Sequence, residues 1–241
     1  MKIPETKQKP TTAYDQITML LYGDPKIGKS TFCSRFEDAF FIATEPGLNF
    51  LETYNLRANS LEECWEIIDA LIASSKVFNP IVVDTVDKLW DFACDSVASS
   101  HGVKSVDAIG FGRGYTEAQA ELKKFVQALV EFNVGLIFTS HSAFIECINP
   151  ETGEPFKRFV PSVDKRVRAV INPLVDIIGY IAISQEYDEK SGKRVSKRIF
   201  HARESSLWEA GDRTNTLPPE FPFSQKVYKS FFEKKGEVDN D

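Results

Sequence analysis

The chain reads Gly23-Asp24-Pro25-Lys26-Ile27-Gly28-Lys29-Ser30 near its start, and this G-x-x-x-x-G-K-S pattern decides the fold. The apolar run Ile17-Thr18-Met19-Leu20-Leu21-Tyr22 precedes it and predicts a buried strand, and Thr31 to Phe36 can continue as a helix. A strand, a glycine-rich turn and a helix form the context in which this pattern binds phosphate groups. The sequence therefore predicts a phosphate-binding loop, the Walker A motif, over residues 23–31.

Each residue type in this loop has a physical role in binding a nucleotide. Gly23 and Gly28 let the backbone curl tightly, so that consecutive N–H groups point at phosphate oxygens. The helix that follows offers its unpaired N-terminal amides to the same anion. Lys29 can reach the β- and γ-phosphates, and the Ser30 hydroxyl can ligate Mg²⁺, which prefers oxygen ligands.

A second apolar run supplies an acidic partner for the metal. Asn79-Pro80-Ile81-Val82-Val83-Asp84 ends in a carboxylate and resembles a Walker B strand, in which Asp84 would hold Mg²⁺ through water. Asp87 lies three residues further on, at the expected start of a helix. We interpret Asp87 first as the N-cap of that helix and only second as a site residue.

Two further runs end in polar residues. Phe40-Phe41-Ile42-Ala43-Thr44-Glu45 is a predicted buried strand whose carboxylate, beside the phosphate-binding loop, can orient and deprotonate an attacking water. Val134 to His141 is a predicted strand whose polar end can contact the γ-phosphate. Hydrolysis would break that contact, which would make a switch for the segment that follows.

The order of these motifs resembles the RecA family of recombinase ATPases. Phe41-Ile-Ala-Thr-Glu45, Ile81-Val-Val-Asp84-Thr-Val86 and Gly135-Leu-Ile-Phe-Thr-Ser-His141 follow the catalytic-glutamate, Walker B and sensor strands of that family. The resemblance implies ATP as the nucleotide, Glu45 as the catalytic base and His141 in place of the family's polar sensor. It spans residues 17–145, with looser similarity to Pro218.

More narrowly, the chain looks like the compact phage-encoded RecA-like proteins of the Sak group, which are recombination or annealing ATPases also described as phage AAA-type nucleotide-binding proteins. In that group Lys-Asp-Arg precedes a Leu-Pro pair, whereas this chain has Gly211-Asp212-Arg213 before Leu217-Pro218. Arg213 is a candidate arginine finger, which would act on the ATP bound to a neighbouring subunit. A structural salt bridge of Arg213 with Asp212 or Glu209 is an equal alternative.

The pattern along the chain predicts an α/β fold, a RecA-like P-loop core with a mostly parallel central sheet flanked by helices. Capping signals at Ser60 and at Thr116 predict two amphipathic helices. Two strand-like runs, 175–184 and 193–202, predict an antiparallel hairpin toward the C-terminus, with its turn at 187–192. We expect a flexible segment over 1–13, one ATPase domain over 14–235 and a disordered acidic tail over 236–241.

Composition favours a reduced, cytoplasmic protein, which would be the host cytoplasm if the chain is phage-encoded. The 4 cysteines have no metal-ligand spacing, and Cys33 and Cys64 lie on apolar helix faces, which predicts buried thiols. No apolar run approaches the ~18 residues of a membrane span, so we expect no membrane partner. The helical spacing of Trp65 and Trp90 predicts core positions rather than platforms for base stacking.

The net charge of −6 excludes a global basic surface, so any nucleic-acid site has to be local. Two predicted loops suit single-stranded DNA. The first, 101–115, is rich in glycine and carries Phe111, Arg113 and Tyr115, which can stack on bases and pair with phosphate. The second, 142–168, holds the basic residues Lys157, Arg158, Lys165, Arg166 and Arg168. The alternative is that both are merely solvated loops. The basic hairpin around Lys190, Lys193, Arg194, Lys197 and Arg198 could track a phosphate backbone, contact a neighbouring subunit or be a solvated edge strand.

The sequence thus predicts a Mg²⁺-dependent, DNA-stimulated ATPase that binds single-stranded DNA and acts in phage DNA recombination or replication. The resemblance implies a homo-oligomer, either a filament or a ring, and leaves room for a single-strand-binding protein as a partner. Two alternatives stay open. One is a helicase or loader motor, and the other is a nucleotide-dependent regulatory protein that binds protein partners.

Overall fold

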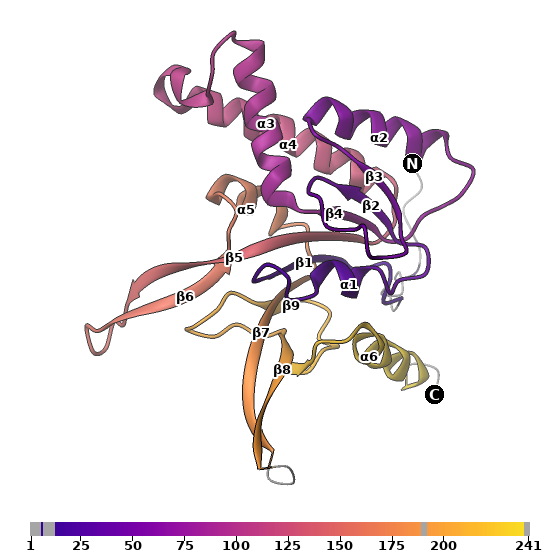
Figure 1. The fold of residues 1–241 in the computed structure, drawn as a ribbon, viewed down its shortest axis with the longest axis vertical. Helices are drawn as coiled ribbons and strands as arrows, with labels where there is room; N and C mark the ends of the chain where they lie inside the picture. Colours follow the sequence, from indigo (N-terminus) through magenta and orange to yellow (C-terminus); the bar gives the residue numbers. More distant parts are fainter. Residues whose placement is uncertain (1–5, 7–12, 189–191, 239–241) are drawn as a thin grey trace.

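The computed structural model describes residue 6 and residues 13–188 and 192–238, and its centre is a twisted, mostly parallel sheet (Figure 1). The strands are β1 (Thr18–Gly23), β2 (Phe40–Ala43), β3 (Tyr54–Arg57), β4 (Ile81–Asp84), β5 (Leu136–Ile148), β6 (Pro155–Pro161), β7 (Ile177–Asp188), β8 (Lys193–His201), β9 (Gly211–Asp212) and β10 (Glu220–Pro222). The α-helices are α1 (Lys29–Cys33), α2 (Leu61–Ala73), α3 (Val86–Ser100), α4 (Arg113–Glu131), α5 (Lys165–Ile171) and α6 (Gln225–Val238). Two 3-10 turns, η1 (Val106–Ala108) and η2 (Gly110–Gly112), precede α4.

The strand order is β10-β8-β7-β1-β5-β4-β2-β3. From β7 to β3 all neighbours are parallel, whereas β8 and β10 add antiparallel strands at one edge. The predicted α/β architecture is confirmed: a mostly parallel central sheet flanked by helices, with an antiparallel hairpin toward the C-terminus. Because β1, β5, β4 and β2 are parallel neighbours, the residues at their carboxyl ends meet at one edge of the sheet.

Alternating side chains of the central strands enter two apolar layers. Leu20, Val83 and Phe138 point toward α2, α3, α4 and α5, whereas Leu21, Val82 and Ile137 point toward α1 and α6. Both layers are closely filled, and Phe125 and Tyr228 are fully buried in opposite ones. Burying one such aromatic side chain contributes about 2–3 kcal/mol. The sheet is therefore fixed from both faces.

Several predicted boundaries are wrong. Thr85, not Asp87, is the N-cap of α3, and its hydroxyl accepts a hydrogen bond from the Lys88 amide. Helix α4 begins at Arg113, before the capping signal at Thr116, because η2 already turns the chain and Gly112 adopts the left-handed conformation that a helix entry needs here. Ser60 does cap α2, as predicted.

The predicted second loop is a hairpin followed by a helix. Strand β5 continues through His141 to Ile148 and pairs with β6 from Ser142–Pro161 to Ile148–Pro155, and α5 follows. We call residues 142–161 the β5–β6 arm. Strands β7 and β8 likewise extend beyond the sheet as the β7–β8 arm, comprising described residues 182–188 and 192–199. Figure 1 shows the two arms leaving the body in different directions.

Some predictions lie outside the described residues. These are the flexible segment over 1–5 and 7–12, the turn residues 189–191 with Lys190, and residues 239–241 of the acidic tail. The first part of that tail, residues 236–238, belongs to α6 and is helical. None of the helices in the described part of the chain has the length and apolar character that crossing a bilayer requires.

Candidate nucleotide-binding site

The predicted phosphate-binding loop connects β1 to α1 at the carboxyl edge of the sheet (Figure 1). Gly28 has φ 107°, a conformation that favours glycine, and α1 begins at the next residue. A Cβ on Gly23 would lie 2.7 Å from the Ile181 carbonyl oxygen of β7, so the strand-to-loop junction has no room for a side chain. The local backbone therefore requires the two glycines of the motif.

Lys29 is a buried cation at the centre of this loop. It is 6% exposed, and its Nζ donates hydrogen bonds to the carbonyl oxygens of Gly23, at 2.8 Å, and Asp24, at 3.1 Å. Burial lowers the pKa of the Lys29 ammonium, while the nearby Asp84 carboxylate acts in the opposite direction. No carboxylate in the described part of the chain forms an ion pair with Lys29. A buried ammonium that has only carbonyl partners fits an anionic ligand such as the β- and γ-phosphates of ATP.

Asp84 lies beside the loop and is held by hydroxyl groups from two other elements. Its Oδ2 accepts a hydrogen bond from Ser30 Oγ at 2.7 Å, and its Oδ1 accepts one from Thr139 Oγ1. Asp84 and Thr139 are partners in register on the parallel strands β4 and β5. A hydroxyl and a carboxylate at this separation are the oxygen ligands that Mg²⁺ prefers, so Ser30 and Asp84 fit the predicted metal site.

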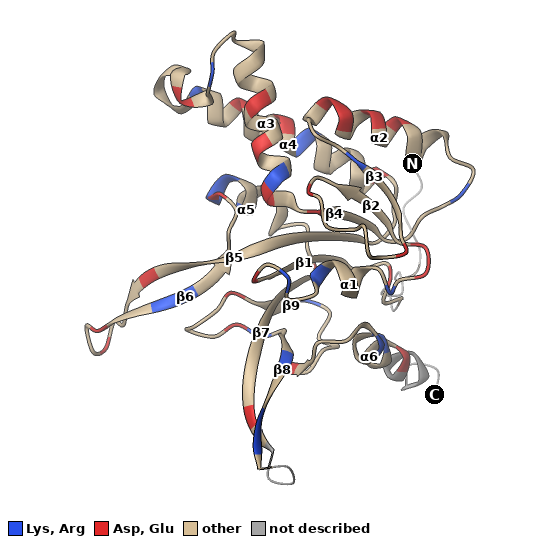
Figure 2. Cartoon of the chain, in the orientation of Figure 1, with Lys and Arg blue, Asp and Glu red and all other residues tan. Residues whose placement is uncertain are grey.

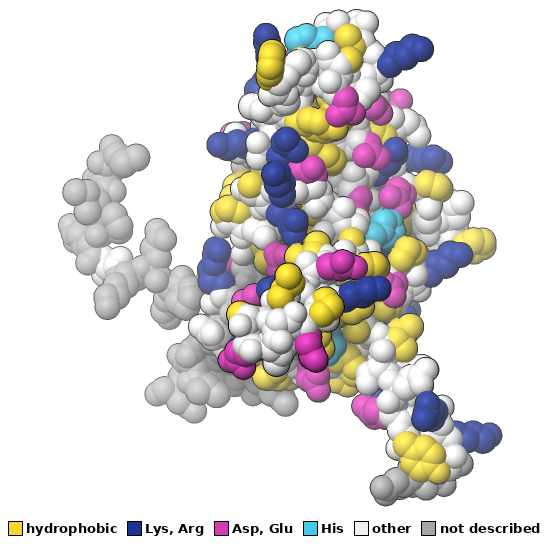
Figure 3. Space-filling model, turned by 90° about the vertical axis from the view of Figure 1, so that its left-hand side faces the viewer, with side chains coloured by type: hydrophobic (Ala, Val, Ile, Leu, Met, Phe, Trp, Pro, Cys, Tyr) yellow, Lys and Arg dark blue, Asp and Glu magenta, His cyan; other side chains and the backbone are white. Residues whose placement is uncertain are grey.

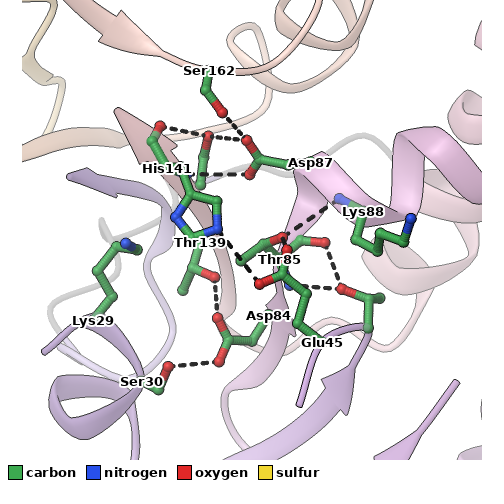
Figure 4. A network of polar contacts seen from close by, with 12 residues as sticks. Lys29, Ser30, Glu45, Asp84, Thr85, Asp87, Lys88, Thr139, His141 and Ser162 are labelled. Atoms are coloured by element: carbon green, nitrogen blue, oxygen red, sulfur yellow. Dashed lines mark hydrogen bonds and ion pairs between the residues drawn. The ribbon is translucent and has the colours of Figure 1, made fainter. Parts of the chain in front are cut away.

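Glu45, Thr85 and His141 form a polar chain across the same edge (Figure 4). Glu45 Oε1 accepts a hydrogen bond from Thr85 Oγ1 at 2.9 Å, and Glu45 Oε2 lies 3.4 Å from His141 Nε2. The other ring nitrogen of His141 is buried without a hydrogen-bond partner in the described residues, and it lies on the side of the ring that faces Lys29 (Figure 4). An unpartnered buried nitrogen at this point fits a ligand group in the space between His141 and Lys29.

Asp87 lies in the first turn of α3, but its side chain belongs to this network rather than capping the helix. Its carboxylate accepts hydrogen bonds from Ser140 Oγ at 3.2 Å and the His141 amide at 3.3 Å, both on β5, and from Ser162 Oγ just after β6. A second link joins the loop directly to the arm, because Ser142 Oγ donates to the Asp24 carboxylate. Sequence reasoning missed Thr85, Thr139 and Ser162, because only the pairing of strands brings these hydroxyls to the carboxylates.

The predicted DNA-binding residues do not converge on one point. Arg113 and His101 both contact Glu117 at 2.6 Å, at the start of α4. Of the second group, three arginines have carboxylate partners: Arg158 with Glu204, Arg166 with Asp164 and Arg168 with Glu209. Lys157 lies over the Phe144 ring at 4.1 Å, and neither Lys157 nor Lys165 forms an ion pair in the part of the chain that the structure describes.

Arg213 lies far from the phosphate-binding loop of its own chain. Its amide donates to the Asp176 carbonyl, and the Asp176 amide donates to the carbonyl of Thr18, where β1 begins. The loop starts at the other end of β1, roughly 17 Å away for a strand of this length. The expected salt bridge with Asp212 or Glu209 is wrong: Asp176 is the partner of Arg213, at 3.9 Å, while Asp212 pairs with Arg203 and Glu209 with Arg168.

Comparison with known proteins gives one family whose members match most of the chain. Residues 15–214 match the AAA domain family, a range that holds the phosphate-binding loop, Glu45, Asp84 and His141. No curated protein matches the chain. Among solved structures, the chain is similar to a KaiC-like protein from the hyperthermophilic archaeon Pyrococcus horikoshii OT3, with 15% sequence identity, a TM-score of 0.44, and coverage of 87% of this chain and 85% of that chain.

The family match spans most of the chain, and the structure brings the predicted phosphate-binding loop and two carboxylates, Asp84 and Glu45, to one edge of the sheet. The protein therefore belongs to the AAA domain family of P-loop ATPases.

Proposed function

We propose that this ATPase binds single-stranded DNA and uses ATP hydrolysis to control its hold on the strand, as a recombination or annealing ATPase acting in phage DNA recombination or replication. The observation that carries the proposal is the position of the Asp87 carboxylate. It contacts the sensor residue His141 and the residues that flank the β5–β6 arm on either side, Ser140 and Ser162. The ATP site and the arm are therefore mechanically connected.

At the ATP site each residue has a separate task. The loop amides and Lys29 bind the phosphates, and Ser30 and Asp84 hold Mg²⁺, which neutralises charge on the β- and γ-phosphate oxygens when bound. Glu45 is positioned by Thr85 Oγ1 and takes a proton from the attacking water. The free ring nitrogen of His141 contacts the γ-phosphate. Hydrolysis therefore removes a contact of the residue that directly precedes the β5–β6 arm.

The arm carries the side chains that single-strand binding needs. Phe144 is 52% exposed and Phe159 37% exposed, and the Lys157 ammonium lies over the Phe144 ring. An aromatic face beside a cation suits a stacked base and its phosphate. Basic positions of β6 and α5 follow one another on this side of the molecule (Figure 2), and Lys and Arg side chains stand among exposed hydrophobic ones there (Figure 3).

The test measures ATP hydrolysis with and without single-stranded DNA, together with DNA binding at about 50 and 200 mM salt. We expect DNA to stimulate hydrolysis and ATP to tighten DNA binding. Phe144→Ala and Lys157→Ala should weaken binding, and Lys157→Ala should also reduce the salt slope by about 0.7 for one lost phosphate contact. Lys124→Ala is the matched control, because Lys124 is an exposed lysine on α4 that pairs with Glu121. Hydrolysis that ignores DNA, with no binding at low salt, would contradict the proposal.

The connection itself is tested by Asp87→Asn, which keeps the shape of the side chain but removes its charge and one of the two oxygens that accept the three hydrogen bonds. We expect this variant to bind DNA and ATP but to lose DNA stimulation. Stimulation equal to that of the wild type would show that the Asp87 link does not couple the two sites.

A second function, a nucleotide-dependent switch that binds a protein partner, is favoured by the ion pairs that the predicted DNA-binding arginines form within the chain. Arg158, Arg166 and Arg168 already have carboxylate partners, and the net charge of the chain is −6. ATP-dependent binding of a protein without any response to DNA would support it. A helicase or loader motor would instead respond to DNA and separate strands, which a strand-displacement assay distinguishes from annealing.

A further inference from the structure

Arg198 of β8 reaches the outer side of the phosphate-binding loop. Strand β7 is in register with β1 up to the pair of Gly23 with Ile181, and then continues past the end of β1. Two residues later, Ile183 pairs with Arg198 of β8. The base of the β7–β8 arm therefore runs alongside the loop, and Figure 1 shows the arm extending away from that point.

The guanidinium of Arg198 touches the loop at its tightest turn. Nη1 donates a hydrogen bond to the Ile27 carbonyl at 3.1 Å, and it lies 2.5 Å from the position that a Cβ on Gly28 would take. The backbone of Arg198 is fixed in turn, because its carbonyl accepts a hydrogen bond from the Phe223 amide at 2.9 Å. The Phe223 ring stacks on Phe32 of α1 at 4.9 Å. Arg198 is thus anchored to the helix that follows the loop.

The charge of Arg198 is not neutralised within the described residues. No carboxylate there forms an ion pair with it, whereas its neighbour Lys197 pairs with Glu186 at 2.5 Å. A positive charge next to an anion-binding loop raises the affinity of that loop for a polyphosphate, and added salt screens the effect.

We propose that Arg198 is a positioning residue for the nucleotide. It holds the Ile27–Gly28 peptide in the orientation that directs the following amides at the phosphates, and it adds a cation behind the loop. The amides of such a loop face the anion, and Arg198 binds a carbonyl, so it acts from the side away from the phosphates and within its own chain. A movement of the β7–β8 arm would then alter nucleotide affinity directly.

Four variants test this role. Arg198→Ala removes both the donor and the charge, Arg198→Gln keeps a donor without the charge, and Arg198→Lys keeps the charge and one donor direction. Arg194→Ala is the matched control, because Arg194 lies four residues away on the same face of β8 and makes no hydrogen bond to the loop in the described structure. ADP binding is measured by calorimetry without DNA at low and high salt, and hydrogen exchange of the loop amides is measured without nucleotide.

We expect Arg198→Ala to weaken ADP binding about tenfold, the effect of one lost charge-assisted hydrogen bond, and to speed exchange of the loop amides. Arg198→Lys should restore most of the affinity for ADP. Arg198→Gln should bind ADP with a smaller salt dependence than the wild type. Wild-type affinity in Arg198→Ala would overturn the proposal, and so would an equal loss in Arg194→Ala. Because no DNA is present, neither result depends on the proposed DNA-binding function.

Discussion

Lys29 and Glu45 are expected to act at different stages of the ATPase reaction. Lys29 is buried in the loop, where we propose that it binds phosphate, so Lys29→Ala should abolish both ATP binding and hydrolysis. Glu45 contacts Thr85 and His141 and makes no hydrogen bond to the loop in the described residues, so Glu45→Gln should bind ATP normally and turn over at least a hundredfold more slowly, about the contribution of a general base.

These two variants are compared by a nucleotide-binding titration and a phosphate-release assay. Glu52→Gln serves as the control for Glu45→Gln, because Glu52 is an exposed carboxylate in the same connection between β2 and β3. Retained hydrolysis in Lys29→Ala would contradict the site assignment. Loss of ATP binding in Glu45→Gln would contradict the division of roles.

At the scale of elements, one buried carboxylate organises the turn that follows β9. The side chain of Asp212 has no exposed surface, and it accepts hydrogen bonds from the amides of Thr214, Thr216 and Leu217, in addition to its ion pair with Arg203. Burial by itself would raise the pKa of Asp212, but the hydrogen bonds and Arg203 outweigh it and lower the pKa below the ordinary value. The turn depends on a charged Asp212.

Asp212→Asn should therefore lower the free energy of unfolding by about 2–4 kcal/mol. Because the pKa is lower in the folded chain, the contribution of Asp212 is complete above the ordinary aspartate pKa of about 3.9 and is lost as the pH falls through the lower folded value. Denaturant unfolding from neutral pH to pH 2 should show a constant difference between variant and wild type that shrinks only below about pH 4. Asp91→Asn, an exposed residue on α3 paired with Lys88, should change stability little. A difference that disappears already at pH 6 would contradict this account.

At the scale of the whole molecule, the position of Arg213 bears on assembly. The residue is 62% exposed in its side chain and lies at the edge of the sheet opposite its own phosphate-binding loop. A finger at this position can act only on the ATP of a neighbouring subunit. We therefore expect a homo-oligomer, in a filament or a ring, and we expect ATP to promote its assembly.

Mixing two inactive variants tests this expectation. Lys29→Ala supplies Arg213 but cannot bind ATP, and Arg213→Ala has an intact site but no finger. If Arg213 acts between subunits, a mixture should recover part of the hydrolysis that each variant alone lacks, and light scattering should show assembly with ATP. Full activity in Arg213→Ala alone would show that its contact with Asp176 is purely structural.

The sequence by itself determined the fold class and predicted the nucleotide site. Walker A is local, since Gly23, Gly28, Lys29 and Ser30 sit within one turn and need only a strand before and a helix after. The positions of Asp84 and Glu45 followed as well, because residues at the carboxyl ends of parallel strands meet at one edge whatever the strand order. The resemblance to RecA-like ATPases added the expected order of these strands.

Only the tertiary structure decided what surrounds that site. The roles of Asp87, Ser162 and Arg198 depend on pairings between residues that lie 53 to 171 positions apart in the chain. No local pattern encodes such pairings, because a single hydroxyl or guanidinium gives the same signal on a solvated loop and at a site. The continuation of β5 beyond His141 was missed for a related reason. Its hydrogen bonds are completed by β6, which lies outside the local sequence, and none of the residues 142–148 is buried in the core.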